Sequence, residues 1–528
     1  MKKFALFVFL LPLLFSCEQE KPQPPNIVFI MSDDHAFQAV SAYGHNLNKT
    51  PNIDRIAKEG ALFNKGFVTN SICAPSRAVM LTGKHSFVNG KVDNIQDFDW
   101  DQPNFAKNLQ AVGYQTAMVG KIHLRGLPQG FDYSAVLPGQ GHYYNPDFII
   151  NGVKERIQGY VTSITTRLSL DWLKNKRDKT KPFLLLYHQK APHRNWQSEE
   201  KYLSLFDDKT FDFPNNFFDN YEGRPAAAAQ EMLIAATEEQ IAAAHGNGGH
   251  GRWGHDFKFL VDPYGRETRF NKELKRFTPE QREAWLKAYT PKNDALKAAK
   301  LEGKELALWK FNRYIKDYLR TIQSVDDGVG EVLDYLEQNG LTENTIVVYT
   351  SDQGFYLGEH GWFDKRFMYE ESLRTPLLMK YPKEIKPDTK IDQMIQNLDF
   401  APTFLDYAGV DIPDEMQGES FRKIVSQETS EWRDAIYYTY YEYPSVHMVK
   451  RHNGVRTDRY KLMHFYYDID VWELYDLKKD PAEMNNIYND PAYAEIQQMM
   501  HKRYDEMRKK YGDSDELDKQ FIDSYVNR

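Results

Sequence analysis

Short, unbroken apolar runs recur along the first 380 or so residues of the chain. The first, Asn26–Met31, is bounded by prolines on one side and by Ser32-Asp33-Asp34 on the other, as expected of a strand buried on both faces. Similar runs lie at Thr116–Val119, Phe183–Tyr187, Thr345–Thr350 and Leu377–Tyr381. Segments of helical period, such as Tyr314–Asn339, separate them. Strands that alternate with helices predict an α/β fold with a mainly parallel, helix-flanked sheet.

From about residue 430 the pattern changes. Short tyrosine-rich runs at Ala435–Tyr441 and Tyr460–Phe465 are followed by Trp472–Leu477 and by a final charged helix. Such runs, spaced by turn residues, are typical of antiparallel strands. We therefore expect residues 430–528 to form a smaller C-terminal subdomain built on an antiparallel sheet.

Residues 206–308 are polar and alanine-rich, and we interpret them as an insertion of helices and loops. The segment includes His245, His250 and His255 within a glycine-rich run. Their spacing fits no set of metal ligands, so a loop is the simpler interpretation. We assign no chemistry to this insertion.

The N-terminus has the pattern of a lipoprotein signal peptide. Met1-Lys2-Lys3 precedes the apolar run Phe4–Phe15, which is too short for a permanent membrane span, and Cys17 follows. Residues 1–17 would then be the signal peptide, with Cys17 as the lipidated residue and residues 18–25 as a tether. This predicts export to the periplasm or the outer-membrane surface, with the lipid anchor as the only membrane contact. Plain secretion is the alternative.

Composition narrows the classes of partner. The chain has 528 residues, a formal net charge of −8 and 14% aromatic residues. The acidic balance argues against nucleic acid, and the aromatic residues suit a pocket that holds sugar rings. Of the two cysteines, Cys17 lies in the signal region, so Cys73 has no disulfide partner. A lone cysteine is usually a small buried hydrophobic residue. A functional role for Cys73 therefore has to be argued from the neighbouring residues.

Acidic residues directly follow two of the predicted strands. Asp33 and Asp34 come after the first, and Asp352 and Gln353 come after Thr345–Thr350. The carboxyl ends of parallel strands form the binding crevice of such sheets, so three carboxylates and an amide could meet at one cation. Oxygen ligands of this kind favour Ca²⁺ or Mg²⁺ over zinc. The alternative is that each aspartate caps the next helix.

Cys73 precedes a predicted helix. Pro75 suits the first turn of a helix that continues through Leu81. A group at the start of that helix would face the positive end of the helix dipole and free N–H groups, which favour a sulfate-like anion. Arg77, one turn further on, would add a fixed positive charge.

The segment Cys73-Ala74-Pro75-Ser76-Arg77, followed by Leu81-Thr82-Gly83, resembles the formylglycine motif of type I sulfatases. In that family the cysteine is oxidised to an aldehyde, 3-oxoalanine, by a formylglycine-generating or anaerobic sulfatase-maturating enzyme. The resemblance extends from about Asn26 to Tyr488. It implies an alkaline-phosphatase-like fold, with a large mixed, mainly parallel sheet in a catalytic domain at residues 26–429 and a smaller C-terminal antiparallel-sheet domain.

The same resemblance implies a set of site residues. The ligands of a divalent cation, Ca²⁺ or alternatively Mg²⁺, would be Asp33, Asp34, Asp352, Gln353 and the modified Cys73. Gln353 departs from the pattern, since many family members have asparagine there. Gly120-Lys121-Ile122-His123, Ala191-Pro192-His193 and Lys365 match the remaining basic positions.

In this family the hydrated aldehyde offers two hydroxyls, one of which attacks sulfur to form a covalent sulfo-enzyme. Lys121 and Lys365 would neutralise the sulfuryl oxygens, and His193 would protonate the departing sugar oxygen. His123 would remove the proton of the second hydroxyl, so that sulfate is expelled and the aldehyde returns.

The loop from Gly358 to Pro376 resembles the corresponding loop of bacterial sulfatases that act on N-acetylglucosamine 6-sulfate. Asp364 and Arg366 flank Lys365, and His447 and His452 come from the C-terminal region, so these four could bind sugar hydroxyls. A salt-bridged loop and surface histidines are the structural alternative. The resemblance implies an exo-acting 6-O-sulfatase that acts on N-acetylglucosamine or glucosamine residues of host glycans such as heparin, heparan sulfate or mucin.

Three alternatives stay open. The chain could desulfate another sugar position, or be a phosphatase or phosphodiesterase of the same superfold, since phosphate and sulfate are both tetrahedral. It could also be a non-catalytic glycan-binding lipoprotein. The intact Cys73 motif argues against a phosphatase or phosphodiesterase and against a non-catalytic lipoprotein.

Overall fold

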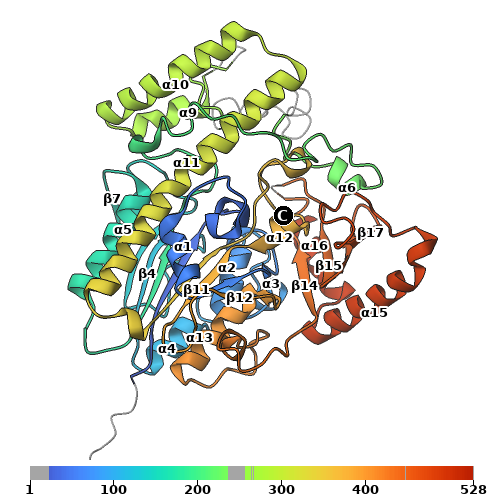
Figure 1. Cartoon of the computed structure of the whole chain (residues 1–528). Coiled ribbons are helices and arrows are strands. Elements are labelled where there is room, and N and C mark those ends of the chain that lie inside the picture. The colour runs from blue at the N-terminus through green and yellow to red at the C-terminus, as the bar shows by residue number, and fades with distance from the viewer. Residues whose placement is uncertain (1–22, 236–255, 263–264, 266, 446, 527–528) are drawn as a thin grey trace, which may run out of the picture.

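The computed structural model describes residues 23–235, 256–262, 265, 267–445 and 447–526. The predicted signal peptide, Cys17 and the histidine run between residues 245 and 255 lie outside these residues. Figure 1 shows the catalytic sheet on the left and centre, with the C-terminal strands on the right.

In the described part of the chain, ten strands form one central sheet, in the order β12-β2-β11-β9-β1-β8-β4-β5-β6-β7. The five strands from β9 to β5 are parallel, whereas β11, β6 and β7 run antiparallel to their neighbours. The predicted mixed, mainly parallel sheet is confirmed. The strands are β1 (Asn26–Ser32), β2 (Ala61–Phe63), β4 (Gln115–Lys121), β5 (Tyr133–Leu137), β6 (Asp147–Ile150), β7 (Val153–Arg156), β8 (Phe183–His188), β9 (Thr345–Ser351), β11 (Leu377–Lys380) and β12 (Thr389–Ile391).

Alternate side chains of β1 enter two different cores. Val28 and Ile30 pack on one face of the sheet, and Ile27, Phe29 and Met31 pack on the other. Both faces are covered by helices, which explains why this strand has no polar alternation. The first face is covered by α1 (Pro51–Lys58), α5 (Val161–Asp171) and α11 (Gly303–Gln338), and the second by α2 (Cys73–Thr82), α4 (Phe105–Ala111) and α13 (Phe400–Ala408).

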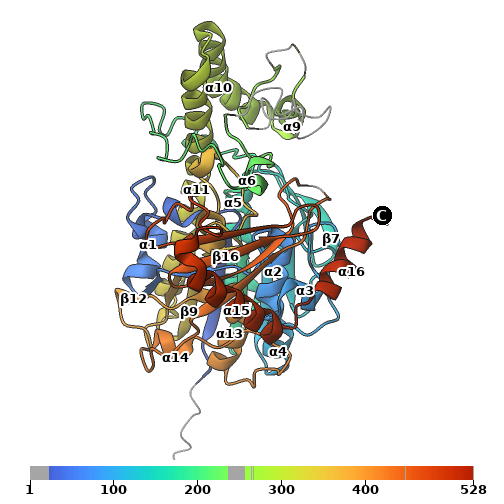
Figure 2. The same ribbon diagram turned by 90° about the vertical axis from the view of Figure 1, so that its right-hand side faces the viewer.

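The predicted insertion projects from the sheet. The helices α9 (Arg269–Glu273) and α10 (Pro279–Ala299) lie above the catalytic domain, beside the upper part of α11 (Figures 1 and 2). The expected end of the insertion at residue 308 falls inside α11, which begins at Gly303 rather than near Tyr314. Its first turn is exposed, so no apolar stripe marks this start in the sequence.

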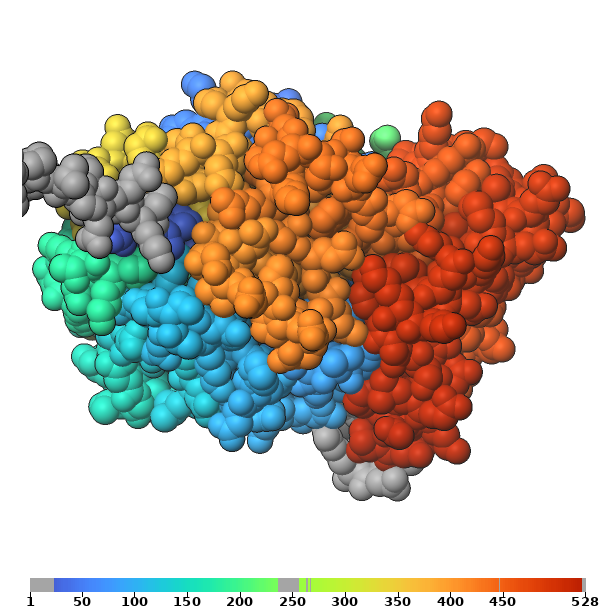
Figure 3. Space-filling model, turned by 90° about the horizontal axis from the view of Figure 1, so that it is seen from below, coloured from blue at the N-terminus to red at the C-terminus, as the bar shows by residue number. Residues whose placement is uncertain are grey.

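Four antiparallel strands form the predicted small sheet near the C-terminus, in the order β14-β15-β16-β17. Tyr438 and Phe465 of this sheet share one core with Phe355 and Phe367 of the catalytic loop. Seen from below in Figure 3, the C-terminal residues lie directly against the catalytic domain. The shared core fixes the loop between β9 and β11, whereas the division near residue 430 stays a prediction. The elements are β14 (Ala435–Tyr440), β15 (His452–Thr457), β16 (Tyr460–Phe465), β17 (Val471–Asp476), α15 (Ala494–Tyr511) and α16 (Asp515–Val526).

The remaining described elements are short. Two-residue strands form a three-stranded sheet in the order β10-β3-β13, and none of the helices in the described ranges is long and apolar enough to cross a membrane. These elements are β3 (Gly66–Phe67), β10 (Arg374–Thr375), β13 (Ile395–Gln396), α3 (Ser86–Asn89), α6 (Pro225–Ala228), α12 (Glu370–Leu373) and α14 (Arg422–Val425).

Replacing Gly120 with alanine is expected to destabilise the protein by about 3–5 kcal/mol. Gly120 pairs with His188 at the end of β4, has φ +106°, and an added Cβ would lie 1.8 Å from the His188 carbonyl oxygen. Gly113→Ala is the matched control, because its φ is +93° but no atom lies within 4 Å. We expect this control to cost only about 1–2 kcal/mol. Denaturant unfolding measures both, and equal losses would show that backbone strain alone matters.

Candidate active site

Strand pairing brings the two acidic pairs together. β1 and β9 are parallel neighbours with Ser32 opposite Ser351, so the residues that follow both strands emerge at the same edge. The backbone N–H of Asp34 donates to Asp352 Oδ1 at 3.0 Å. One carboxylate oxygen from each of Asp33, Asp34 and Asp352 lies within 4.8 Å of the others, and all three residues are fully buried.

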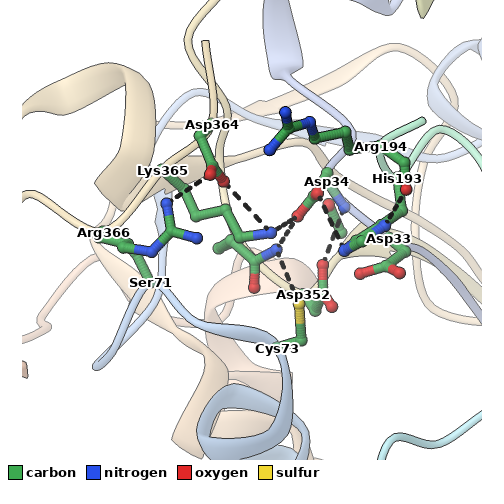
Figure 4. Close-up of polar contacts among 12 residues, drawn as sticks. Asp33, Asp34, Ser71, Cys73, His193, Arg194, Asp352, Asp364, Lys365 and Arg366 are labelled. Atoms are coloured by element: carbon green, nitrogen blue, oxygen red, sulfur yellow. Dashed lines mark hydrogen bonds and ion pairs between the residues drawn. The ribbon is translucent and has the colours of Figure 1, made fainter. Parts of the chain in front are cut away.

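The carboxylate cluster of Asp33, Asp34 and Asp352 contains buried oxygens that accept no hydrogen bond. Asp33 Oδ1, Asp34 Oδ2 and Gln353 Oε1 are buried and accept no hydrogen bond. Unpaired buried oxygens cost free energy unless another group satisfies them, and a hard divalent cation binds carboxylate and amide oxygens. The residues therefore fit a divalent cation held by Asp33, Asp34, Asp352 and Gln353 (Figure 4).

The three carboxyl groups differ in their surroundings. Burial would raise the pKa of Asp33, yet Lys121, His193 and Arg77 hold it well below its usual value. Burial raises the pKa of Asp34 against the opposing charge of Lys365, and burial with the charge of Asp33 raises the pKa of Asp352 to about 7. A bound cation would stabilise the ionised form of all three carboxyl groups, since it would place a positive charge next to these buried side chains.

Cys73 lies at the first position of α2 and is buried, as expected from the sequence. Its Sγ is 3.9 Å from the Nε2 donor of Gln353, so it adjoins the carboxylate cluster. Burial raises the pKa of the Cys73 thiol, which keeps the sulfur protonated and a poor nucleophile. Nucleophilic chemistry at this position therefore needs a group other than the free thiol.

Three buried cations face the cluster. Arg77 donates from Nε and Nη2 to Asp352 Oδ2 at 3.0 and 2.8 Å, and from Nη1 to the Lys121 carbonyl oxygen at 2.5 Å. Lys121 pairs with Asp33, and Lys365 Nζ lies 2.5 Å from Asp34 Oδ1. Arg77 thus positions Asp352, whereas the two lysines balance the carboxylates nearest the cavity.

The two predicted histidines lie at the same edge. His193 Nδ1 donates to the Arg194 carbonyl oxygen at 2.5 Å, which leaves Nε2 as the free ring nitrogen, 3.8 Å from Asp34 Oδ2. Burial and the nearby Lys121 charge hold the pKa values of His193 and His123 well below their usual range. His123 Nδ1 is buried without a partner.

A cavity of about 240 Å³ opens above Cys73. Asp34, His193 and Lys365 line it together with Cys73, so the predicted reactive groups share one space with the predicted sugar-binding residues Asp364, Arg366 and His447. Asp33, Arg77, Lys121, His123, Asp352 and Gln353 lie outside its lining and support it.

The residues expected to bind sugar hydroxyls form a paired group. Arg366 Nη1 lies 2.5 Å from Asp364 Oδ2, and Lys365 Nζ lies 3.6 Å from Asp364 Oδ1. Asp364 and Arg366 have φ +80° and +96°, an uncommon backbone conformation that often marks a functional site. His447 pairs with Glu442. This wall presents fixed donors and acceptors to one side of a ligand (Figure 4).

Comparison with known proteins agrees with this geometry. The profile described as Sulfatase matches residues 25–410, and one described as N-sulphoglucosamine sulphohydrolase, C-terminal, matches residues 358–510. An N-acetylglucosamine-6-O-sulfatase of Bacteroides thetaiotaomicron is 47% identical over 530 residues, covering 97% of this chain and 92% of the relative. The chain belongs to the sulfatase family. Membership in this family implies, in general, a formylglycine and a divalent metal.

More distant relatives and solved structures support the same conclusion. The human N-acetylglucosamine-6-sulfatase is 27% identical over 445 residues, which span 79% of this sulfatase and 67% of the human protein. A structure of BT4656 in complex with its substrate D-glucosamine-2-N,6-O-disulfate superposes with a TM-score of 0.88 at 47% identity, covering 93% of this chain and 99% of that one.

One predicted site residue is placed elsewhere. His452 is fully buried on β15, where Nε2 accepts from the Met368 N–H at 3.1 Å and Nδ1 donates to the Lys450 carbonyl oxygen at 2.8 Å. Its ring packs against Tyr438 and Phe465. Neither ring nitrogen is free, so the expectation that His452 binds the sugar of this sulfatase is wrong.

The cavity also includes residues that the sequence did not single out. They come from three loops and from the insertion, where no motif identifies them, although Lys190 lies only three residues before His193. They include Asn94, Gln140, His142, Lys190, Arg194, Asn195, Glu273 and Arg276.

Proposed function

We propose that this sulfatase removes the 6-O-sulfate from N-acetylglucosamine or glucosamine residues of host glycans such as heparin, heparan sulfate or mucin. The observation that supports this most is the shared cavity, in which Cys73 and Lys365 lie beside Asp364, Arg366 and His447. A primary 6-sulfate is the most protruding ester of the sugar, so it can reach Cys73 while the ring hydroxyls meet the wall above. The 47% identical relative has the same named specificity.

The residues divide the chemistry between them. Formylglycine hydrate would supply the nucleophile once Cys73 is oxidised, and Asp33, Asp34, Asp352 and Gln353 would hold a cation that supplies Lewis-acid chemistry. Lys121 and Lys365 lower the cost of negative charge on those oxygens. His193 presents Nε2 to the cavity, where the negative sulfuryl group would raise its pKa and let it protonate the departing sugar oxygen. His123 would act as the base that releases sulfate.

A panel of sulfated monosaccharides tests the position of the ester. We expect release of sulfate from N-acetylglucosamine 6-sulfate and glucosamine 6-sulfate, with 2-O-, 3-O- and 4-O-sulfated sugars at least about 100-fold slower in kcat/KM. Desulfation of another position while the 6-sulfate survives would disprove the proposed specificity without affecting family membership.

Arg366→Met is expected to lower kcat/KM for N-acetylglucosamine 6-sulfate by about 100-fold, because it removes a charged donor from the sugar-binding wall. Arg366 has a buried Nε without an acceptor and contacts neither Cys73 nor the carboxylate cluster. A small aryl sulfate, which has no sugar hydroxyls, should be hydrolysed within about fivefold of wild type. Equal losses on both substrates would instead place Arg366 in the sulfate-binding centre.

The cofactor, maturation and location complete the proposal. Ca²⁺ is the cation that best suits a site of carboxylate and amide oxygens, with Mg²⁺ as the alternative. A formylglycine-generating or anaerobic sulfatase-maturating enzyme would oxidise Cys73. The signal-like N-terminus supports export and lipidation at Cys17, with display in the periplasm or on the outer membrane.

A further inference from the structure

Lys190 is a buried amine without a hydrogen-bonded or ion-paired carboxylate, and burial, followed by the charge of Lys121, lowers its pKa to about 7. It lies in the loop after β8, is 3% exposed, and lines the active-site cavity. Among the described residues its ammonium makes no hydrogen bond or ion pair, and its only described partner is the ring of Tyr143, whose centroid is 4.7 Å from Nζ. A buried charge is costly when it is neither paired nor hydrogen-bonded. An anionic ligand would remove that cost.

The carboxylates that act electrostatically on Lys190, namely Asp33, Glu273 and Asp34, are each bound to other groups. Arg276 lines the same cavity and has a buried Nε without an acceptor, while its Nη2 donates to the Asn145 carbonyl oxygen at 2.8 Å and lies 3.3 Å from Asp147 Oδ1. Burial, followed by Arg276 and Lys190, lowers the pKa of the neighbouring His142. Glu273 is the nearest acidic residue of this wall, and it accepts from Gln197 at 2.7 Å and from Asn195 at 2.5 Å. Its oxygens are thus already engaged.

The charge of the cavity contrasts with that of the chain. Six cationic side chains line it against three carboxylates, although the formal net charge of the protein is −8. Lys365 and Arg366 are accounted for by the sulfate and the sugar hydroxyls. Arg194, Arg269 and Arg276 pair with Asp256, Glu273 and Asp147, respectively. Lys190 is therefore the basic group of the described lining that has no ion-paired carboxylate, and one sulfate ester at Lys365 leaves it unused.

This wall faces the sugar from the side opposite Arg366. In Figure 4 His193 and Arg194 lie on one side of Cys73, and Asp364 and Arg366 lie on the other. Lys190 belongs to the His193 side, because Tyr143, on which its ammonium rests, donates to the His193 carbonyl oxygen at 2.5 Å. A sugar whose 6-sulfate meets Cys73 would therefore direct its other end, or its neighbouring residue, toward Lys190.

We propose that Lys190, assisted by Arg276, forms a second anion subsite that binds an additional sulfate or carboxylate of the substrate. The inference rests on the proposed 6-O-sulfatase function and narrows its substrate class to glycans with a second negative group near the 6-sulfated sugar. That group is either an N-sulfate on the same sugar or the carboxylate of an adjoining uronic acid. Both are oxyanions that an ammonium can bind through a charge-assisted hydrogen bond.

The test compares kcat/KM for four substrates in wild type and Lys190→Met. They are N-acetylglucosamine 6-sulfate, glucosamine 2-N,6-O-disulfate, a disaccharide with a uronic acid next to the 6-sulfated sugar, and the methyl ester of that disaccharide. Wild type should favour at least one dianionic substrate by about 10- to 100-fold, the effect of one charge-assisted hydrogen bond. Preference for the disulfate indicates the N-sulfate as ligand, whereas preference for the free acid over its ester indicates the uronate.

In Lys190→Met that preference should fall to within about threefold, while kcat/KM for N-acetylglucosamine 6-sulfate stays within about threefold of wild type. Arg269→Met is the matched control. It removes the same charge from the same cavity, but Arg269 has a 67% exposed side chain that already pairs with Glu273 at 3.2 Å. This control should keep the preference, because exposed paired charges contribute little.

Each other outcome has a distinct meaning. A preference that survives in Lys190→Met, or a wild type that cleaves the 6-sulfate without favouring a second anion, overturns the subsite and leaves the 6-O-sulfatase function intact. A wild type that cleaves none of the four substrates overturns the proposed function as well. The melting temperature separates binding from a structural role: it should be unchanged or higher in Lys190→Met, and a marked fall would overturn the inference.

Discussion

Cys73→Ala is expected to lower kcat/KM for N-acetylglucosamine 6-sulfate by at least about 10⁴-fold, to the background of the assay. Cys73 lies at the floor of the cavity, at the start of α2 and beside Gln353. Among cysteine, serine and threonine side chains, Cys73 is the only one in the described lining of the cavity. Alanine removes the reacting group and leaves the supporting residues unchanged.

Substrate binding and stability serve as the controls for this variant. Removing one buried sulfur leaves a small cavity, so the melting temperature should change by only a few degrees. The dissociation constant for the 6-sulfated sugar should stay within about tenfold of wild type, because the lysines and the sugar-binding wall remain. Measurable turnover in a folded Cys73→Ala protein would place the nucleophile elsewhere.

Removing the divalent cation is expected to abolish turnover and to destabilise the protein. Without the cation, Asp33, Asp34 and Asp352 are close and buried, and Asp33 and Asp34 each keep one oxygen that accepts no hydrogen bond. A cation present at about 1,000 times its dissociation constant would stabilise the folded state by about 4 kcal/mol. Chelation should lower the melting temperature, and added Ca²⁺ should restore both it and activity.

The stability measurement is best made on Cys73→Ala, because that protein cannot turn over and its melting temperature reports cation binding by the four remaining ligands. Asp34→Asn is a useful companion, since it keeps the shape of the ligand but removes one charge, and it should need a higher Ca²⁺ concentration for the same shift. A melting temperature that neither chelation nor Ca²⁺ changes would contradict the cation site. Stronger stabilisation by Mg²⁺ would instead revise the identity of the ion.

The carboxylate cluster was predictable because it depends on strand order alone. Asp33-Asp34 and Asp352-Gln353 each follow an unbroken apolar strand, and parallel strands deliver such residues to one edge. The structure adds the register, with Ser32 opposite Ser351. Cys73 at a helix start was predictable for a similar reason, since Pro75 fixes the first turn.

The sugar-binding wall depends on contacts that sequence spacing does not report. His447 and His452 looked equivalent, yet one lines the cavity and the other fills the core between β15 and the catalytic loop. Lys190 comes from the loop after β8 and Arg276 from a short 3-10 helix of the insertion, with no shared motif, and only the fold brings them together. The significance of Lys190 arises from the absence of an ion-paired carboxylate among the described residues, which can be recognised only in three dimensions.

Peptide mass spectrometry across Cys73 tests the central claim most directly, with wild-type protein made in a host able to modify it. The account predicts that the thiol is replaced by an aldehyde, with sulfur lost and oxygen gained, and that specific activity rises in proportion to the aldehyde fraction across preparations. A fully active preparation in which Cys73 remains an unmodified thiol would contradict it.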